Sequence, residues 1–292
     1  MYAVFRKELA DHINSSRFII LFALALLAAI FALYVATQNI RGEVTAETEF
    51  IFLKLFTTSG ERLPSFLFFI SLFIPIIAIA LGFDAISSER VSGNLSRLLS
   101  QPIYRDAVIN GKFLAGLAVL AIIIASLIAI VAGMGLRIIG VPPNSEEVFR
   151  LIVFALISVI YGAFWMALAV LFSVFFNRAA SAMLASIGLW IFFFFFMPII
   201  AGVIGNIGVA AAVARISPCT LYGQTTIVLL MPGLDPTTAL ILQQFTGRMP
   251  TPLPFGQSLL LVWPQLVTVI ALAAICFAVS YIRFMREEIR AT

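Results

Sequence analysis

The sequence predicts an all-α membrane protein, and its composition and its long apolar runs carry this prediction. Hydrophobic residues fill 62% of the 292 positions and only 11% are charged, with a mean hydropathy of +1.10. A soluble domain is about half apolar and about a quarter charged. Several runs reach the roughly 20 apolar residues that a helix needs to cross a hydrocarbon core about 30 Å thick. We therefore expect one polytopic transmembrane domain over residues 1–292.

Six runs have the length and apolarity of membrane-spanning helices, and no acidic or basic residue lies in the middle of any of them. Pro75 and Pro198 fall inside the second and fifth runs, where each removes a backbone donor and is expected to kink the helix. Phe192–Phe196 is interpreted as lipid-facing or packing phenylalanines, with an aromatic gate as the alternative. The expected spans are Phe18–Thr37, Pro64–Phe83, Phe113–Leu136, Leu151–Phe176, Ala180–Ile204 and Leu259–Ile282.

Residues 205–258 separate the last two spans and contain six prolines. Apolar pieces such as GVAAAVARI and TTIVLLM lie between these prolines. We expect a long external loop with one or two short surface or re-entrant helices, and not a seventh span. Such a loop is a candidate contact surface for an extracytoplasmic partner protein.

The distribution of Lys and Arg predicts the orientation, because cytoplasmic segments of membrane proteins carry more of them. With a cytoplasmic N-terminus, eleven of these residues fall in the inner segments, among them Arg90, Arg97 and Lys112. The outer segments are longer and hold seven: Arg41, Lys54, Arg62, Arg137, Arg150, Arg215 and Arg248. We expect a multi-pass protein of the cell membrane with both termini in the cytoplasm. The membrane then accounts for the basic isoelectric point, and no nucleic-acid partner is expected.

The first 17 residues predict an amphipathic helix at the inner membrane interface. Tyr2, Phe5, Leu9 and Ile13 recur at spacings of three and four. Arg6, Lys7, Glu8 and Asp11 are expected on the opposite side, facing away from this stripe.

Several kinds of chemistry lack the residues they require. His12 is the single histidine, so no Ser–His pair and no histidine-ligated metal or haem site is expected within the membrane. Cys219 and Cys276 lack metal-ligand spacing. No G-x-x-x-x-G-K-[ST] motif is present, so no nucleotide-phosphate cradle is expected. We expect a non-catalytic protein without cofactors or metals, whose energy comes from a partner.

A patterned polar segment interrupts this apolar chain at Asp84–Lys112, DAISSERVSGNLSRLLSQPIYRDAVINGK. Ser87 or Ser88 is expected to cap a short helix that carries Glu89 and Arg90, and Gly93 to end it. Asn94 is a suitable cap for a second helix, in which Leu95, Leu98 and Leu99 form one apolar face. Gln101–Pro102 is expected to stop that helix, and Asp106 to cap the next one. This pattern predicts a short docking element at the cytoplasmic surface, whereas a simple connection would be shorter and less patterned.

The segment resembles the signature of ABC-2-class permeases, the membrane subunits of ATP-binding-cassette exporters, in which this loop reads roughly I-S-S-E-R-x-x-G-T-L-x-x-L-L-S-x-P-x-x-R-x-x-x-x-x-G-K. Within that class the chain is similar to the subgroup that serves maturation of nitrous-oxide reductase. Asn94 replaces the usual Thr, and Ser96 and Arg97 stand where an acidic residue is common. The matching residues are Ile86, Ser87, Ser88, Glu89, Arg90, Gly93, Leu95, Leu98, Leu99, Ser100, Pro102, Arg105, Gly111 and Lys112.

The resemblance implies a role for each part of the chain. Ser87–Leu99 would be a coupling helix that docks on a separate ATPase subunit, and Tyr2–Asn14 a connecting helix beside it. Two permeases and two ATPases would assemble about a two-fold axis, with the substrate path along the permease dimer interface. The residues expected to couple to the ATPase are Ser87, Ser88, Glu89, Arg90, Gly93, Leu95, Arg97, Leu98, Leu99 and Pro102.

Other interpretations stay open at this point. The chain could be an ATP-independent channel or a secondary carrier, or a membrane scaffold without transport activity. Glu89 and Arg90 could pair with each other, or with the N-terminal helix at Lys7 and Glu8, instead of contacting an ATPase.

Overall fold

The computed structural model describes residues 1–43, 50–60, 64–91, 104–204, 207–232 and 254–286. These residues form helices joined by short connections, with no β-strand among them. Six helical stretches are long and apolar enough to cross a membrane, which confirms the predicted all-α fold and the number of spans. In chain order they are Ser16–Ile40, Phe66–Val91, Arg105–Ile139, Ser145–Phe175, Ala179–Val203 and Phe255–Arg286.

Several spans are longer than the sequence predicted, because amphipathic turns extend them beyond their apolar runs. Helix α7 (Arg105–Ile139) begins at Arg105, so Asp106 lies in its first turn and is not its cap. Helix α8 (Ser145–Phe175) begins six residues before the expected Leu151. Helix α14 (Phe255–Arg286) takes residues 255–258 from the expected external loop.

Helix α8 is the centre of the bundle. It packs against α4 (Phe66–Gly82), α7, α9 (Ala179–Ile191), α12 (Pro218–Leu230) and α14. Its span is the most buried of the six, whereas those of α2 (Ser16–Glu43), α9 and α14 expose most of their apolar surface. Tyr161 and Trp165 of α8 are among the largest fully buried side chains. A displacement of α8 therefore acts directly on most of the other spans.

The fifth span is interrupted at its phenylalanine run. A π-helical turn, η1 (Phe192–Phe196), joins α9 to α10 (Met197–Val203), and Pro198 lies in the first turn of α10. Proline cannot donate the usual backbone hydrogen bond, and π-helical turns of this kind accompany kinks in helices. Phe192, Phe195 and Phe196 are exposed, and Phe194 stacks edge-on against Phe68 of α4.

Two short helices lie within residues 207–232, a part of residues 205–258 for which one or two short surface or re-entrant helices were expected. Helix α11 (Ile207–Ala214) packs against α10, and α12 follows it. Helix α12 is not at the surface: Leu221, Tyr222, Leu229 and Leu230 are buried, and α12 packs on α8 and α14. The sequence pattern suggested short helices here but not that one of them is part of the core.

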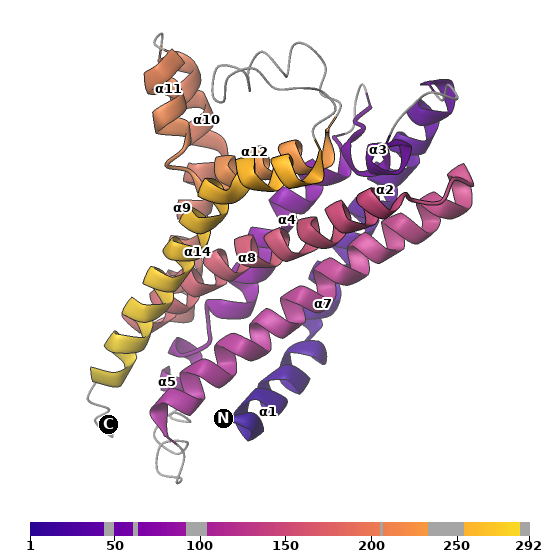
Figure 1. The fold of residues 1–292 in the computed structure, drawn as a ribbon. Coiled ribbons are helices and arrows are strands. Elements are labelled where there is room, and N and C mark those ends of the chain that lie inside the picture. The colour runs from indigo at the N-terminus through magenta and orange to yellow at the C-terminus, as the bar shows by residue number, and fades with distance from the viewer. Residues whose placement is uncertain (44–49, 61–63, 92–103, 205–206, 233–253, 287–292) are drawn as a thin grey trace.

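Different helices lie at the two ends of the bundle (Figure 1). Helix α1 (Tyr2–Ile13), α5 (Ser87–Val91) and the C-terminal end of α14 lie at one end, called here the α1–α5 end. Helices α3 (Ile51–Thr57), α11 and α12 lie toward the opposite end. The six spans thus return the two ends of the chain to the same side.

Two glycines on these helices give a test of how tightly the bundle packs. A Cβ at Gly82 would lie 2.9 Å from the backbone oxygen of Met166 and 3.1 Å from Ala169 Cβ, so α4 and α8 would have to separate. Gly82→Ala is expected to destabilise the protein by about 1–3 kcal/mol, the usual cost of overpacking. Thermal unfolding of the purified protein in detergent measures this loss.

Gly188→Ala is the matched control, because nothing lies within 4 Å of a Cβ at this exposed position of α9. Alanine also favours a helix over glycine by about 1 kcal/mol. The control is expected to be neutral or stabilising, and equal losses from both substitutions would contradict the close packing of α4 on α8.

Candidate functional site

The polar motif that begins with Ile86 is built into the bundle at the α1–α5 end. Helix α4 ends at Gly82, a short turn follows, and α5 starts at Ser87. Ile86 is fully buried against Ile109, Val174 and Phe284, a small apolar cluster contributed by α7, α8 and α14. Ile86 therefore anchors the start of α5 in the bundle.

Helix α8 caps α5 through Ser173. The hydroxyl of Ser173, which is completely buried, accepts hydrogen bonds from the backbone N–H groups of Ile86 (3.0 Å) and Ser87 (3.1 Å). These N–H groups have no partner within the helix, and the serine satisfies them as an N-cap residue would. Ser87 and Ser88, which were expected to cap α5, instead donate their hydroxyl hydrogens to the carbonyls of Phe83 and Asp84.

Arg90 adds side-chain hydrogen bonds between α5 and the end of α8. Its Nη1 donates to Asn177 Oδ1 at 3.0 Å and its Nη2 to the carbonyl of Val174 at 3.3 Å. Both acceptors lie at the C-terminal end of α8, where carbonyl groups lack helical partners and a cation is favoured by the helix dipole. Ser173 and Arg90 together attach α5 to α8 by both backbone and side chain.

Lys112 joins three helices at the centre of this end. Its Nζ lies 2.9 Å from Glu8 Oε1 of α1 and 2.8 Å from Glu89 Oε1 of α5, while Lys112 itself belongs to α7. The three side chains are only 8%, 12% and 15% exposed for Lys112, Glu8 and Glu89. We call Glu8, Lys112 and Glu89 the ion triad. Glu8 was expected to face away with the other charges of α1, but it is buried against α7.

Helix α1 reaches the triad because α7 carries a glycine at the crossing point. A Cβ at Gly111 would lie 3.0 Å from Val4 Cγ1 and 3.1 Å from Val4 Cβ, so a larger residue would push α1 outward. Val4 and Glu8, one turn apart, are the buried residues of α1, whereas Tyr2 and Ile13 are exposed. The face of α1 that contacts α7 is therefore Val4–Glu8. In the predicted stripe, Tyr2 and Ile13 are exposed, while Leu9 packs against the main apolar core.

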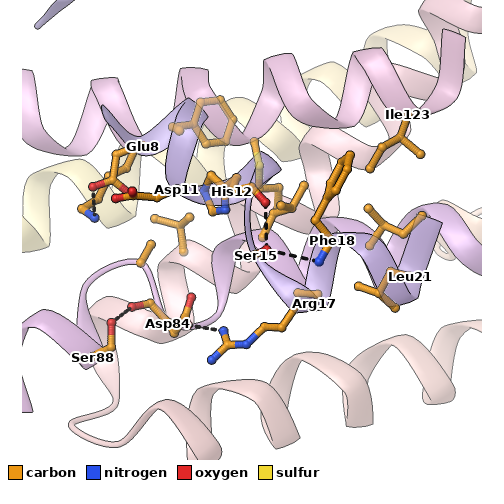
Figure 2. Close-up of a pocket in the computed structure, with 18 of the residues that line it drawn as sticks. Glu8, Asp11, His12, Ser15, Arg17, Phe18, Leu21, Asp84, Ser88 and Ile123 are labelled. Atoms are coloured by element: carbon orange, nitrogen blue, oxygen red, sulfur yellow. Dashed lines mark hydrogen bonds and ion pairs between the residues drawn. The ribbon is translucent and has the colours of Figure 1, made fainter. Parts of the chain in front are cut away.

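A second ion pair connects the neighbouring helices. Arg17 at the start of α2 pairs with Asp84 just beyond α4, and its guanidinium lies 5.3 Å from the centre of the Phe83 ring. Figure 2 shows this pair beside Ser88 and opposite His12. This pair holds the start of α2 against the end of α4, beside the triad.

The electrostatics of α1 follow from this burial. Burial alone would raise the pKa of Glu8, but Lys112 and Lys7 outweigh it and hold the pKa below its usual value. Burial lowers the pKa of His12, and the carboxylates of Glu8 and Asp84 offset this effect only in part. Glu8 is therefore charged and His12 neutral at pH 7.

The opposite end holds a buried arginine that the sequence placed in an external segment. Arg150 is completely buried in α8 and binds Glu146 Oε1, the carbonyl of Leu229 (2.7 Å) and Ser258 Oγ (3.2 Å). It thereby joins α8 to α12 and α14. The spacing of four between Glu146 and Arg150 is the signal in the sequence that could have predicted the pair.

The predicted coupling residues divide into two groups. Ser87, Ser88, Glu89 and Arg90 lie on α5, and the structure brings them to Ser173, Asp84, Lys112 and the end of α8. Glu89 joins α1 indirectly, because Lys112 binds both Glu89 and Glu8. Gly93, Leu95, Arg97, Leu98, Leu99 and Pro102 lie outside the described residues.

These contacts fasten α5 to its neighbours in the bundle. Within the described ranges no group of three or more His, Cys, Asp or Glu side chains is placed to hold a metal ion. The triad, Ser173 and Arg90 are charge and hydrogen-bond contacts that hold one surface helix rigidly against three others. The described residues thus combine six apolar spans with a short helix that is fastened at one end of the bundle.

Comparison with known proteins identifies the class. Residues 2–289 match the family described as ABC-2 family transporter protein, and the chain belongs to this family. It is a membrane permease of the ABC-transporter class. This agrees with the resemblance carried by Ile86–Arg90 and by the leucines that follow.

Two curated relatives have the same printed name, "Probable ABC transporter permease protein NosY". The protein from Pseudomonas aeruginosa is 30% identical to this chain over 196 residues, which is 66% of each chain. The protein from Stutzerimonas stutzeri is 27% identical over 199 residues, again 66% of each chain. The matched part thus spans just under two thirds of these relatives.

Removing the charge at the centre of the triad is expected to loosen the α1–α5 end. Lys112→Met leaves Glu8 and Glu89 buried close together without their shared cation, and loss of one member of a buried ion pair costs about 3 kcal/mol. Thermal unfolding in detergent is expected to show this loss. Lys7→Met, which removes a cation that is 58% exposed, is the matched control and is expected to change little.

A charge-free triad separates electrostatics from packing. The triple variant Glu8→Gln, Glu89→Gln, Lys112→Met is expected to recover most of the stability that Lys112→Met loses, because no charge is left buried alone. If the triple variant is no more stable than Lys112→Met, the ion triad does not account for the loss.

His12 predicts a pH dependence that can be isolated, because the chain has no other histidine. A folded-state pKa below the ordinary 6.5 means that the unfolded chain takes up the proton first. The stability due to neutral His12 is therefore present above pH 6.5 and is lost as pH falls through the folded-state pKa. Unfolding midpoints between pH 7 and about pH 5, above the range in which carboxylates titrate, should decrease in the wild type.

His12→Gln keeps a polar side chain of similar length without a titrating group in this range. The variant is expected to show a flatter stability profile over the same interval. An identical slope in both proteins would mean that His12 is not the group that takes up the proton.

Proposed function

We propose that this chain is the membrane subunit of an ABC exporter and is driven by a separate ATPase subunit. The observation that carries the proposal is the attachment of α5 to α1, α7 and α8 by the ion triad, Ser173 and Arg90. A surface helix that only linked two spans would not need these three attachments. A helix that receives force from a partner does need them.

In this proposal the coupling segment has two parts with different tasks. Ser87–Arg90 transmits, because its side chains contact the bundle. Gly93, Leu95, Arg97, Leu98, Leu99 and Pro102 are proposed to dock on the ATPase, as the family resemblance implies. Burial of one leucine in such an interface contributes about 1.5–3 kcal/mol. Docking and transmission would thus be separated along a single loop.

The path of the movement follows from the packing. A displacement of α5 pulls on the C-terminal end of α8 through Ser173 and Arg90, and on α1 and α7 through Lys112. Because α8 also packs on α4, α9, α12 and α14, it carries the movement to the other spans and to the opposite end. There Arg150 joins α8 to α12 and α14, so this end would move with it.

The ATPase must be cytoplasmic, so the α1–α5 end is proposed to face the cytoplasm. Two observations support this orientation. Lys and Arg are more numerous in the segments that would then lie inside. Helix α1 and the end of α14, which carries Arg283 and Arg286, lie at this end together (Figure 1). Helix α1 would then lie at the inner surface of the cell membrane as a connecting helix.

The working unit is proposed to be two permeases and two ATPases about a two-fold axis. Closed two-fold symmetry is the commonest arrangement of oligomers, and α2, α9 and α14 expose apolar faces that lipid and a second copy can share. Export is the direction that the family resemblance implies. The external segment over residues 205–258 is the proposed contact for an extracytoplasmic partner.

Leu98→Asp tests the docking part of the proposal. The change places a charge in the proposed contact and leaves the triad intact, whereas Glu89→Lys would put two cations side by side at Lys112. We expect the Leu98→Asp permease to reach the membrane at wild-type levels and to bind its ATPase about tenfold or more weakly. The purified permease is titrated against its ATPase, and the fraction of ATPase that co-purifies with the permease at each concentration gives the affinity.

Val141→Asp is the control for adding an acid to an apolar position. Val141 is exposed, and it lies between α7 and α8 at the end of the bundle away from α1. This variant is expected to retain the ATPase. Wild-type ATPase binding by Leu98→Asp, or equal loss in both variants, would count against docking at residues 93–99.

A further inference from the structure

A cavity of about 480 Å³ opens at the α1–α5 end, among α1, α2, α4 and α7. Small-molecule sites in proteins commonly have volumes of about 300–1,000 Å³, so the cavity can accommodate a ligand of ordinary size. It is separate from the contacts between α5 and α8. The ion triad and the Arg17–Asp84 pair form part of its wall.

The cavity has a polar end and an apolar end (Figure 2). Glu8, Asp11 and His12 lie toward one end, and Phe18, Leu21 and Ile123 toward the other. Ile77, Leu81 and Met166 add further apolar wall. A ligand that fills this space must be amphiphilic. A wholly polar molecule would place polar groups at the apolar end, where no wall residue can hydrogen-bond to them.

The charges of the wall select the sign of the ligand's polar head. Three cations face four carboxylates, which leaves one net negative charge while His12 is neutral. Asp11 is the least committed of the carboxylates: among the described residues its ion-pair partner is Lys7 alone, at 3.7 Å, and its side chain is 62% exposed. The charged wall residues are Lys7, Arg17 and Lys112 against Glu8, Asp11, Asp84 and Glu89.

His12 adds a neutral polar group to the same end. Its imidazole makes no hydrogen bond to the described residues. The hydroxyl of Ser15 donates to the backbone carbonyl of His12 and not to the ring. A neutral imidazole offers one donor and one acceptor. The acceptor nitrogen can take a hydrogen from an ammonium group that is paired with Asp11 one residue away.

We infer that this cavity binds an amphiphile with a single cationic head and an apolar tail. The head lies at Asp11 and His12, and the tail lies along Phe18, Leu21 and Ile123. An ammonium head of this kind occurs both in membrane phospholipids and in soluble amphiphilic amines. The site is formed within one chain, so binding does not depend on an ATPase or on a second copy of the permease.

The test uses dansylcadaverine, a primary amine joined to an apolar fluorophore whose emission rises on transfer from water to an apolar site. The purified permease in maltoside micelles is titrated with this probe, with direct excitation of the dansyl group. Saturable binding is expected. The matched carboxylate probe, dansyl-6-aminohexanoic acid, is expected to bind at least about tenfold more weakly, because the net negative charge of the cavity wall repels its negative head.

Two pairs of variants locate the probe. Leu21→Trp fills the apolar end of the cavity and is expected to abolish the saturable signal. Leu24→Trp, on the exposed side of the same helix, is expected to leave the signal unchanged. Asp11→Asn is expected to weaken amine binding about threefold, since an exposed charge acts through water. Asp106→Asn removes an acid at the start of α7, outside the cavity, and is expected to have no effect.

Competition distinguishes the sources of the head group. Displacement of the probe by dioleoyl phosphatidylethanolamine, but not by the phosphatidylglycerol with the same tails, supports a membrane lipid as the occupant. Binding that neither lipid displaces supports a soluble amphiphilic amine. Absence of saturable binding, equal binding of the two dansyl probes, or a wild-type signal from Leu21→Trp overturns the inference.

Discussion

The buried ammonium of Lys112, shared by Glu8 and Glu89, sets the geometry of the whole α1–α5 end. An ammonium group removed from water is costly unless its hydrogens find charged or polar acceptors. Here two carboxylates from two other helices supply them, at 2.9 and 2.8 Å. If α1 or α5 leaves α7, Lys112 loses one of its two carboxylate partners. Three segments that are far apart in the chain are thus held as one body.

Hydrogen bonds at the ends of α8 extend this constraint through the membrane. At the α1–α5 end, Ser173 and the last carbonyls of α8 hold α5. At the opposite end, Arg150 holds α12 and α14, and Glu147 accepts a hydrogen bond from the backbone of Phe52 in α3. Between these ends α8 is packed against apolar neighbours, where Gly82 allows α4 to approach it closely. A helix fixed at both ends and closely packed between them moves as a unit.

The lateral surfaces have the opposite character. Exposed apolar side chains cover much of α2, α9 and α14, and the span of α14 is the least buried of the six. Surfaces of this kind can slide against lipid or another apolar surface without breaking specific contacts. In its described residues the protein therefore combines specific polar contacts at its two ends with apolar sides that make no specific contact.

The sequence by itself determined the fold class, the six spans and the position of the motif at Ser87–Arg90. Composition and run length suffice for this, because a bilayer imposes a fixed length of apolar helix on any spanning chain. It did not determine what the motif residues contact. Serine can cap a helix or donate to the preceding turn, and only the packing of α5 on α8 decided that Ser173 caps it while Ser87 and Ser88 bond backwards. Glu8 was assigned to the polar side of α1 by periodicity, yet it is buried, because its partner Lys112 lies 104 positions away on α7. The burial of α12 and the placement of Arg150 likewise depend on neighbours distant in the chain, and local patterns cannot contain that information.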